Sequence, residues 1–219
     1  EISRSVFAAA DSALGFPLST LCFEGSKAEL DKTENTQPAV LTVSVAALKA
    51  LEEYGIKPDM CAGLSLGEYT ALVCSGVIDF PEAVKLVQKR GRYMQEAVPQ
   101  GQGGMAAILG LDNAAVEEAC RLASATGIVR VANYNCPGQA VIAGERQALE
   151  EAVVRAGELG ARKAVLLDVS GPFHTELLRP AAEKLDLELS GIRFSELQIP
   201  VLSNVNADFI RDEAEAKKL

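Results

Sequence analysis

Residues 61–69, with the sequence CAGLSLGEY, decide how this chain is interpreted. Gly63 and Gly67 flank Ser65 at minus and plus two, which is the Gly-x-Ser-x-Gly spacing of a nucleophile elbow between a strand and a helix. A serine on such a strained turn points its hydroxyl outward, and its neighbours must lack side chains where the backbone doubles back. The following helix directs N–H groups and its positive dipole end to the same place, where an oxyanion can be held. The alternative is an ordinary turn, since this spacing also arises by chance.

The composition is that of a globular protein with a sizeable core. The chain has 219 residues, of which 48% are hydrophobic and 23% are charged. The net charge of −9 argues against nucleic acid as the main partner. No apolar run reaches the length of a membrane span and no signal peptide is recognised, so we expect no membrane partner and a cytoplasmic location.

Cysteine and histidine usage limits the metal and redox chemistry. The five cysteines form no CxxC pair and are interpreted as reduced core thiols of a cytoplasmic protein: Cys22, Cys61, Cys74, Cys120 and Cys136. The only histidine is His174, which rules out most multi-histidine metal sites. We therefore expect no metal centre.

The order of predicted elements divides the chain into two domains. Before residue 101 the pattern gives a helix over 3–14, a long helix after Thr36 with Pro38 in its first turn, the strand and helix of the elbow, and a helix capped by Asp79. From 101 to 171 the order is βαββαβ, which is ferredoxin-like. The prediction is an α/β protein: a large domain of residues 1–100 and 172–219 with a parallel sheet, and an inserted small domain of residues 101–171.

Arg90 stands out on the helix that follows the elbow. It falls on the same stripe as the apolar residues Ala83, Val87, Met94 and Ala97. A guanidinium on an apolar face needs a partner, usually a carboxylate. That partner can be a carboxylate of the protein, which would make the pair structural, and a functional role for Arg90 stays open as the alternative.

His174 lies in a loop before a predicted helix over 176–189, directly after the sequence GPF at 171–173. A lone histidine is more often structural than catalytic. Its position after a Gly-Pro turn at a domain border favours a functional role. Both interpretations remain open from the residues alone.

Four separated blocks resemble one family: GLSLGEY at 63–69, RGRYMQ at 90–95, NYNCPGQ at 133–139 and GPFH at 171–174. In this order they resemble the malonyl-CoA:acyl carrier protein transacylases of fatty acid synthesis, and the acyltransferase domains of polyketide synthases are similar. The resemblance covers essentially the whole chain. It implies an α/β-hydrolase-like large domain and a ferredoxin-like insertion.

The resemblance also implies a catalytic pair. Ser65 would be the nucleophile and His174 its general base and acid, with the backbone N–H of Leu66 as one oxyanion donor. A malonyl group would pass from coenzyme A to the phosphopantetheine thiol of acyl carrier protein through a malonyl-serine intermediate. Malonyl-CoA and acyl carrier protein would be the partners, and no cofactor would be needed beyond the coenzyme A thioester itself.

The same resemblance implies substrate-binding roles. Arg90 would bind the free carboxylate of malonate with two hydrogen bonds. Phe173 would leave little room for a branch on the acyl group, and Asn135 would lie near the nucleophile.

The sequence departs from the family pattern at three places. Leu64 stands where the family has histidine, and this residue is not the base. Family members begin with a strand and a Pro-Gly-Gln-Gly turn before the first residue here, and they continue past Leu219, so the sequence resembles an internal fragment. Two alternatives therefore stay open: a serine esterase or thioesterase, which shares the elbow, and an inactive transacylase fragment.

Overall fold

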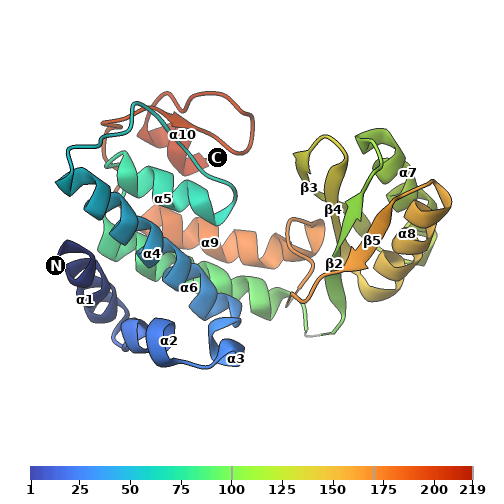
Figure 1. Ribbon diagram of the computed structural model, residues 1–219, viewed down its shortest axis with the longest axis horizontal. Coiled ribbons are helices and arrows are strands. Elements are labelled where there is room, and N and C mark those ends of the chain that lie inside the picture. Colours follow the sequence, from blue (N-terminus) through green and yellow to red (C-terminus); the bar gives the residue numbers. More distant parts are fainter. Residues whose placement is uncertain (100, 170, 219) are drawn as a thin grey trace. The chain divides into compact units, whose positions relative to one another are not determined.

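The computed structural model describes residues 1–99, 101–169 and 171–218. These residues form two compact units, whose elements can be followed in Figure 1. Unit 1 comprises Glu1–Arg92 and Leu185–Leu219, and unit 2 comprises Tyr93–Lys184.

The borders between the units fall inside two helices, α6 (Phe80–Ala97) and α9 (Arg179–Gly191). Each helix contributes residues to both units. The domain limits expected from the sequence stay a prediction, and Gln100, at the first of them, lies outside the described residues.

Unit 1 combines helices with a two-stranded parallel sheet. Strand β1 (Cys61–Ala62) pairs with β6 (Val201–Leu202), and Cys61 lies opposite Val201. Besides its parts of α6 and α9, the unit contains the helices α1 (Ile2–Leu14), α2 (Leu18–Glu24), α3 (Lys27–Leu30), α4 (Thr33–Glu53), α5 (Leu66–Cys74) and α10 (Glu213–Lys218). Because β1 and β6 are parallel, the segments that follow them leave the same edge of the sheet.

One hydrophobic core joins the elements of unit 1. Its largest fully buried side chains include Leu18, Leu41, Val45, Val84 and Leu86. Full burial of each such side chain stabilises the fold by about 1.5–3 kcal/mol relative to exposure. The α6 helix therefore stays in place mainly through its apolar face.

The long helix α4 begins earlier than the sequence suggested. Lys32 is its N-cap residue, and the carbonyl of Lys32 accepts the backbone N–H groups of Asn35 and Thr36, both at 2.8 Å. Thr36 therefore lies within the helix and does not precede it, and its hydroxyl donates to the carbonyl of Leu30 at 2.5 Å. Pro38 accordingly lies inside the helix, beyond its first turn.

Unit 2 is an antiparallel sheet with two helices. Its elements are β2 (Gly103–Leu109), α7 (Asn113–Ala123), η1 (Ser124–Thr126), β3 (Val129–Cys136), β4 (Gln139–Glu145), α8 (Arg146–Glu158), β5 (Lys163–Leu166) and η2 (Glu176–Leu178), together with its parts of α6 and α9. The strand order β3-β4-β2-β5 confirms the ferredoxin-like prediction. Asp112 is the N-cap residue of α7, and its side chain accepts the N–H of Ala115 at 2.8 Å.

The core of unit 2 lies between its sheet and its helices. Ile108 and Ile142 from the sheet pack with Val116 of α7 and Leu149 of α8, and all four side chains are fully buried. On β2 the neighbours of Ile108 are half-buried, whereas on β4 the neighbours of Ile142, Val141 and Ala143, are buried as well.

The cysteines are free thiols, but the expectation that they all lie in the core is wrong. Cys120 is buried and Cys136 is exposed, whereas the other three are partly buried. Burial raises the pKa of Cys120 to about 11, and burial together with a contact to Cys61 raises the pKa of Cys74 to about 12. Both thiols are therefore protonated at neutral pH.

Two features are absent from the described residues. No helix in this part of the chain has the length and apolar character needed to span a bilayer. The same residues contain no group of three or more histidine, cysteine, aspartate or glutamate side chains placed to hold a metal ion.

We predict that Gly91→Ala will destabilise unit 1. A Cβ at Gly91 would lie 2.4 Å from the carbonyl oxygen of Thr33 and 2.8 Å from Cα of Glu34, so α6 and the start of α4 would have to separate. We expect a loss of about 1–3 kcal/mol in the free energy of unfolding, measured by chemical denaturation. The control is Gly191→Ala at the end of α9, where a Cβ meets nothing within 4 Å. Equal stability of the two variants would contradict this close approach.

Candidate active site

Ser65 lies between β1 and α5 in an unusual backbone conformation. Its φ is 52° and its ψ is −107°, outside the regions that residues with a side chain favour. Such a conformation costs of the order of 1–3 kcal/mol and persists only where the surroundings enforce it. The elbow predicted from the glycine spacing is therefore present as a strained turn.

Gly63 and Gly67 have different roles in this turn. A Cβ at Gly63 would lie 2.0 Å from the carbonyl carbon of Gly67 and 2.5 Å from the backbone nitrogen of Glu68. A Cβ at Gly67 would meet nothing within 4 Å. The strand end and the first turn of α5 therefore touch through backbone atoms, and only Gly63 is required for that contact.

The Ser65 hydroxyl is not used to cap its own helix. Ser65 is the N-cap residue of α5, yet its side chain accepts no hydrogen bond from the first turn of that helix. Its Oγ instead accepts a hydrogen bond from Nη2 of Arg90 at 3.0 Å. Leu66 is the first residue of α5, so its backbone N–H is one of those that lack a partner within the helix.

Arg90 is held beside Ser65 by neutral groups. Its Nη1 donates to Oε1 of Gln37 at 2.7 Å, and its guanidinium lies over the ring of Tyr69, 5.6 Å from the centroid. Burial raises the pKa of Tyr69, although the neighbouring Arg90 opposes this rise. The Tyr69 side chain is therefore a neutral phenol at neutral pH. Such a contact is an ordinary cation–π interaction.

A protein carboxylate as the partner of Arg90 is not found. Among residues 1–99, 101–169 and 171–218, none of the ion pairs includes Arg90. The structural ion pair that the sequence allowed for Arg90 therefore has no carboxylate partner in the described part of the chain. The guanidinium retains its charge next to the Ser65 hydroxyl, where it can attract an anionic group.

Two further side chains of unit 1 were not singled out in the sequence. Asn204 follows β6, and its Oδ1 accepts the backbone N–H of Ser65 at 2.8 Å. Glu68, in the first turn of α5, accepts the backbone N–H of Asn204 at 2.7 Å. The feature that could have pointed to Asn204 is its place after β6. Because β1 and β6 pair in parallel, the residues that follow the two strands lie at one edge of the sheet.

His174 and Phe173 belong to a turn of unit 2. His174 has a φ of 62° and is exposed, in a segment where the Thr175 hydroxyl donates to the carbonyl of Pro172 at 2.8 Å. The Phe173 ring packs against a small apolar cluster that contains Met105 and Val141. The positive φ of a residue other than glycine marks this turn, like the elbow, as a place of stored strain.

Asn135 lies near the end of strand β3. Strand β3 continues to Cys136, and only Pro137 and Gly138 form the turn to β4. The register shifts between Tyr134 and Cys136, which places Asn135 at a bulge where it is exposed. Bulges often redirect a side chain near a functional site.

The structure thus brings together the predicted residues of unit 1: Ser65, Leu66 and Arg90 lie around the elbow. The predicted residues of unit 2, Asn135, Phe173 and His174, are described within their own unit. Their roles relative to Ser65 stay predictions.

We predict different effects on stability for alanine at the two glycines of the elbow. Gly63→Ala should lower the free energy of unfolding by about 1–3 kcal/mol or more, because its Cβ would overlap backbone atoms that have no alternative position. Gly67→Ala should leave stability unchanged or raise it by up to about 1 kcal/mol, since alanine favours a helix more than glycine does. Chemical denaturation of both variants measures this difference, and a Gly63→Ala variant as stable as Gly67→Ala would refute the backbone contact.

Comparisons with known proteins agree on one family. Residues 3–215 match the model of the acyl transferase domain. The malonyl CoA-acyl carrier protein transacylase of Escherichia coli O157:H7 is 50% identical over 218 residues, with 96% of this chain and 71% of the relative covered. The transacylase of Bacillus subtilis is 48% identical, with 99% of this chain and 68% of the relative covered.

Solved structures give the same result. An acyl carrier protein S-malonyltransferase from Vibrio cholerae aligns with a TM-score of 0.95 at 44% identity, over 99% of this chain and 71% of that one. A malonyl-transacylase solved in complex with a type II polyketide acyl-carrier protein aligns with a TM-score of 0.97 at 45% identity, over 99% of this chain and 71% of that one. The fold, the elbow and these matches together show that the chain belongs to the acyl transferase domain family.

Proposed function

We propose that this protein transfers a malonyl group from coenzyme A to the phosphopantetheine thiol of acyl carrier protein, as the names of its relatives indicate. The observation that carries the proposal is the 3.0 Å hydrogen bond from Arg90 to the Ser65 hydroxyl, which sets a cation beside the nucleophile. A malonyl thioester has a reactive carbonyl and a free carboxylate, and these are the two groups that such a pair can serve.

The reaction is proposed to proceed by two acyl transfers through Ser65. His174 takes the proton of the Ser65 hydroxyl, Ser65 forms a bond to the thioester carbonyl, and coenzyme A leaves as a thiol after receiving that proton. The carrier thiol then gives its proton to His174 and attacks the malonyl-serine, and Ser65 regains its proton. The backbone N–H of Leu66 stabilises the oxyanion in both steps.

Arg90 is proposed to select substrates that carry a carboxylate. Two parallel hydrogen bonds from the guanidinium would hold the malonyl carboxylate, with Gln37 and Tyr69 keeping the arginine in position. An acetyl group would leave this charge without its anionic partner, which costs of the order of 1.5–3 kcal/mol for each charged hydrogen bond lost. A serine esterase acting on uncharged esters has no use for this arrangement, and the relatives named above do not favour one.

Phe173 and Asn135 are proposed to line the substrate pocket. The Phe173 ring is fixed by its packing against Met105, Val141 and Ala143, so it would resist displacement by a branched acyl group. Asn135 would contribute an amide at the bulge of β3.

The coenzyme A thioester is proposed to act as a substrate, with no further cofactor and no nucleic acid or membrane partner. The five free thiols are consistent with a reducing compartment, so we further propose a cytoplasmic location.

The first test is formation of the acyl-enzyme. On incubation with malonyl-CoA, we expect the intact mass of the chain to rise by one malonyl group, and we expect no such rise for Ser65→Ala. Addition of acyl carrier protein with its phosphopantetheine should then remove the adduct and acylate the carrier. A chain that folds but never gains the adduct would contradict the proposal and would support the inactive-fragment alternative. Release of malonate to water in preference to the carrier would support the esterase alternative.

The second test concerns Arg90. Arg90→Ala should lower kcat/KM for malonyl-CoA by about 10²-fold, while acetyl-CoA is used as well as before or better, because only malonyl loses a charged contact. The control is Arg92→Ala, which removes an exposed arginine two residues along the same helix. Steady-state kinetics with both thioesters measure the ratio, and an unchanged preference for malonyl in Arg90→Ala would rule out this carboxylate-binding role.

A further inference from the structure

We infer that Asn204 is a positioning residue for the nucleophile, holding the backbone of Ser65 and thereby the oxyanion donor at Leu66. Its side-chain carbonyl accepts the N–H of Ser65 at 2.8 Å, across 139 residues of sequence. This inference concerns the acyl-transfer site and rests on the function proposed above.

Asn204 completes the N-terminal cap of α5. In a capping box, an N-cap serine and a glutamate three residues later satisfy each other's backbone N–H groups. Ser65 and Glu68 have this spacing, but Asn204 stands between them: the Ser65 N–H goes to the Asn204 side chain, and the Asn204 N–H goes to Glu68 at 2.7 Å. The backbone N–H of Glu68 goes to the Ser65 carbonyl at 3.1 Å, so neither N–H of a capping box uses the Ser65 hydroxyl, which remains available to Arg90 and to chemistry.

The hydrogen bond acts on the peptide that precedes the nucleophile. Peptide groups are planar, so fixing the N–H of Ser65 fixes the whole peptide between Leu64 and Ser65. Only the φ and ψ of Ser65 then separate this fixed plane from the N–H of Leu66. Because Ser65 is in a strained conformation, loss of the bond should allow it to relax and to turn the oxyanion donor away.

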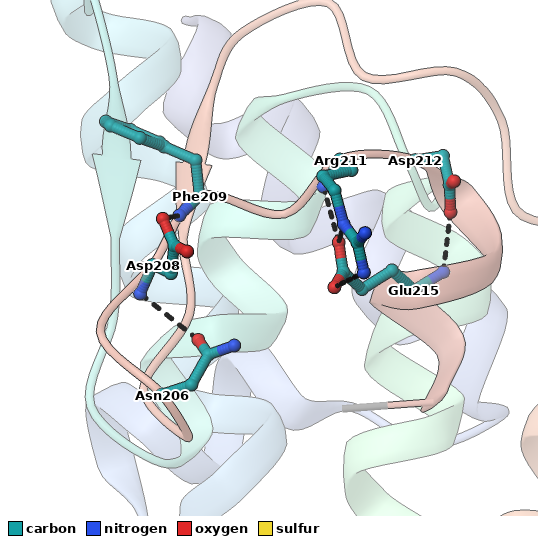
Figure 2. Close-up of polar contacts among 6 residues, drawn as sticks. All are labelled: Asn206, Asp208, Phe209, Arg211, Asp212 and Glu215. Atoms are coloured by element: carbon teal, nitrogen blue, oxygen red, sulfur yellow. Dashed lines mark hydrogen bonds and ion pairs between the residues drawn. The ribbon is translucent and has the colours of Figure 1, made fainter.

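The loop that carries Asn204 is anchored at its base. Ser203 donates its backbone N–H to the carbonyl of Asp208 at 2.9 Å, which closes the loop after β6. Two further hydrogen bonds lie farther along the same loop and do not involve Asn204 (Figure 2). The Asn206 side chain accepts the N–H of Asp208 at 3.1 Å, and the Asp208 side chain accepts the N–H of Phe209 at 2.8 Å. Asn204 itself is exposed, so packing does not account for where its amide points.

Three variants test this role by the rate of acyl-serine formation from malonyl-CoA. Asn204→Leu removes the acceptor at similar volume and should slow the reaction by about ten- to a hundredfold, with KM changed less than about twofold. Asn204→Asp keeps an oxygen acceptor and should recover most of the lost rate. The matched control is Asn206→Leu, which removes an amide from the same loop that accepts the N–H of Asp208 and should keep the parent rate. A parent rate in Asn204→Leu, an equal loss in Asn206→Leu, or no recovery in Asn204→Asp would each overturn the inference.

A second measurement does not depend on turnover. Hydrogen exchange of the Ser65 amide, followed by NMR, should accelerate by about tenfold or more in Asn204→Leu and stay at the parent rate in Asn204→Asp and Asn206→Leu. Unchanged exchange in Asn204→Leu would overturn the inference. If the parent chain forms no acyl-serine, the proposed function fails, and this exchange pattern still decides whether Asn204 holds Ser65.

Discussion

The strained backbone of Ser65 is the constraint on which the site depends. A serine at the start of a helix ordinarily uses its hydroxyl to satisfy the backbone of the next turn. Here the φ and ψ of Ser65 remove the hydroxyl from that task, and other groups replace it. The absence of a side chain at Gly63 permits the tight return of the chain, and Asn204 satisfies the backbone N–H. The Ser65 hydroxyl therefore has no role in capping the helix and is available for the reaction.

Arg90 illustrates how a cation can be held without being neutralised. A carboxylate partner would have fixed its position, but it would also have competed with an anionic substrate. An amide oxygen from Gln37 and the face of Tyr69 give direction to the guanidinium while leaving its charge in place. The absence of a side chain at Gly91 lets α6 approach the start of α4, the helix that carries Gln37. The close packing of two helices therefore contributes to the placement of this charge.

Much of this architecture could be predicted from local patterns. The alternation of strands and helices in 101–171 predicted the ferredoxin-like order, and the glycine spacing around Ser65 predicted the elbow, because both depend on neighbours in sequence. Gln37 and Asn204 could not be predicted in this way. Each is a lone amide without a motif, and each acquires its role through a contact 53 or 139 residues away. The start of α4 was missed for a local reason: Thr36 has the residue type of a helix cap, but its hydroxyl donates to the carbonyl of Leu30 and the helix has already begun.

The pairing of β1 with β6 has a consequence for how the protein is made. The two strands that support the nucleophile are separated in the chain by the whole of unit 2, so they cannot meet while the ribosome is still producing that unit. Contacts of such long sequence separation are slow to form, because the intervening chain must first lose conformational freedom. A folded ferredoxin-like unit shortens the effective loop that has to close. The order of synthesis thus makes the elbow one of the last parts of the molecule to acquire its final shape, after most of the hydrophobic core of unit 1 has been translated.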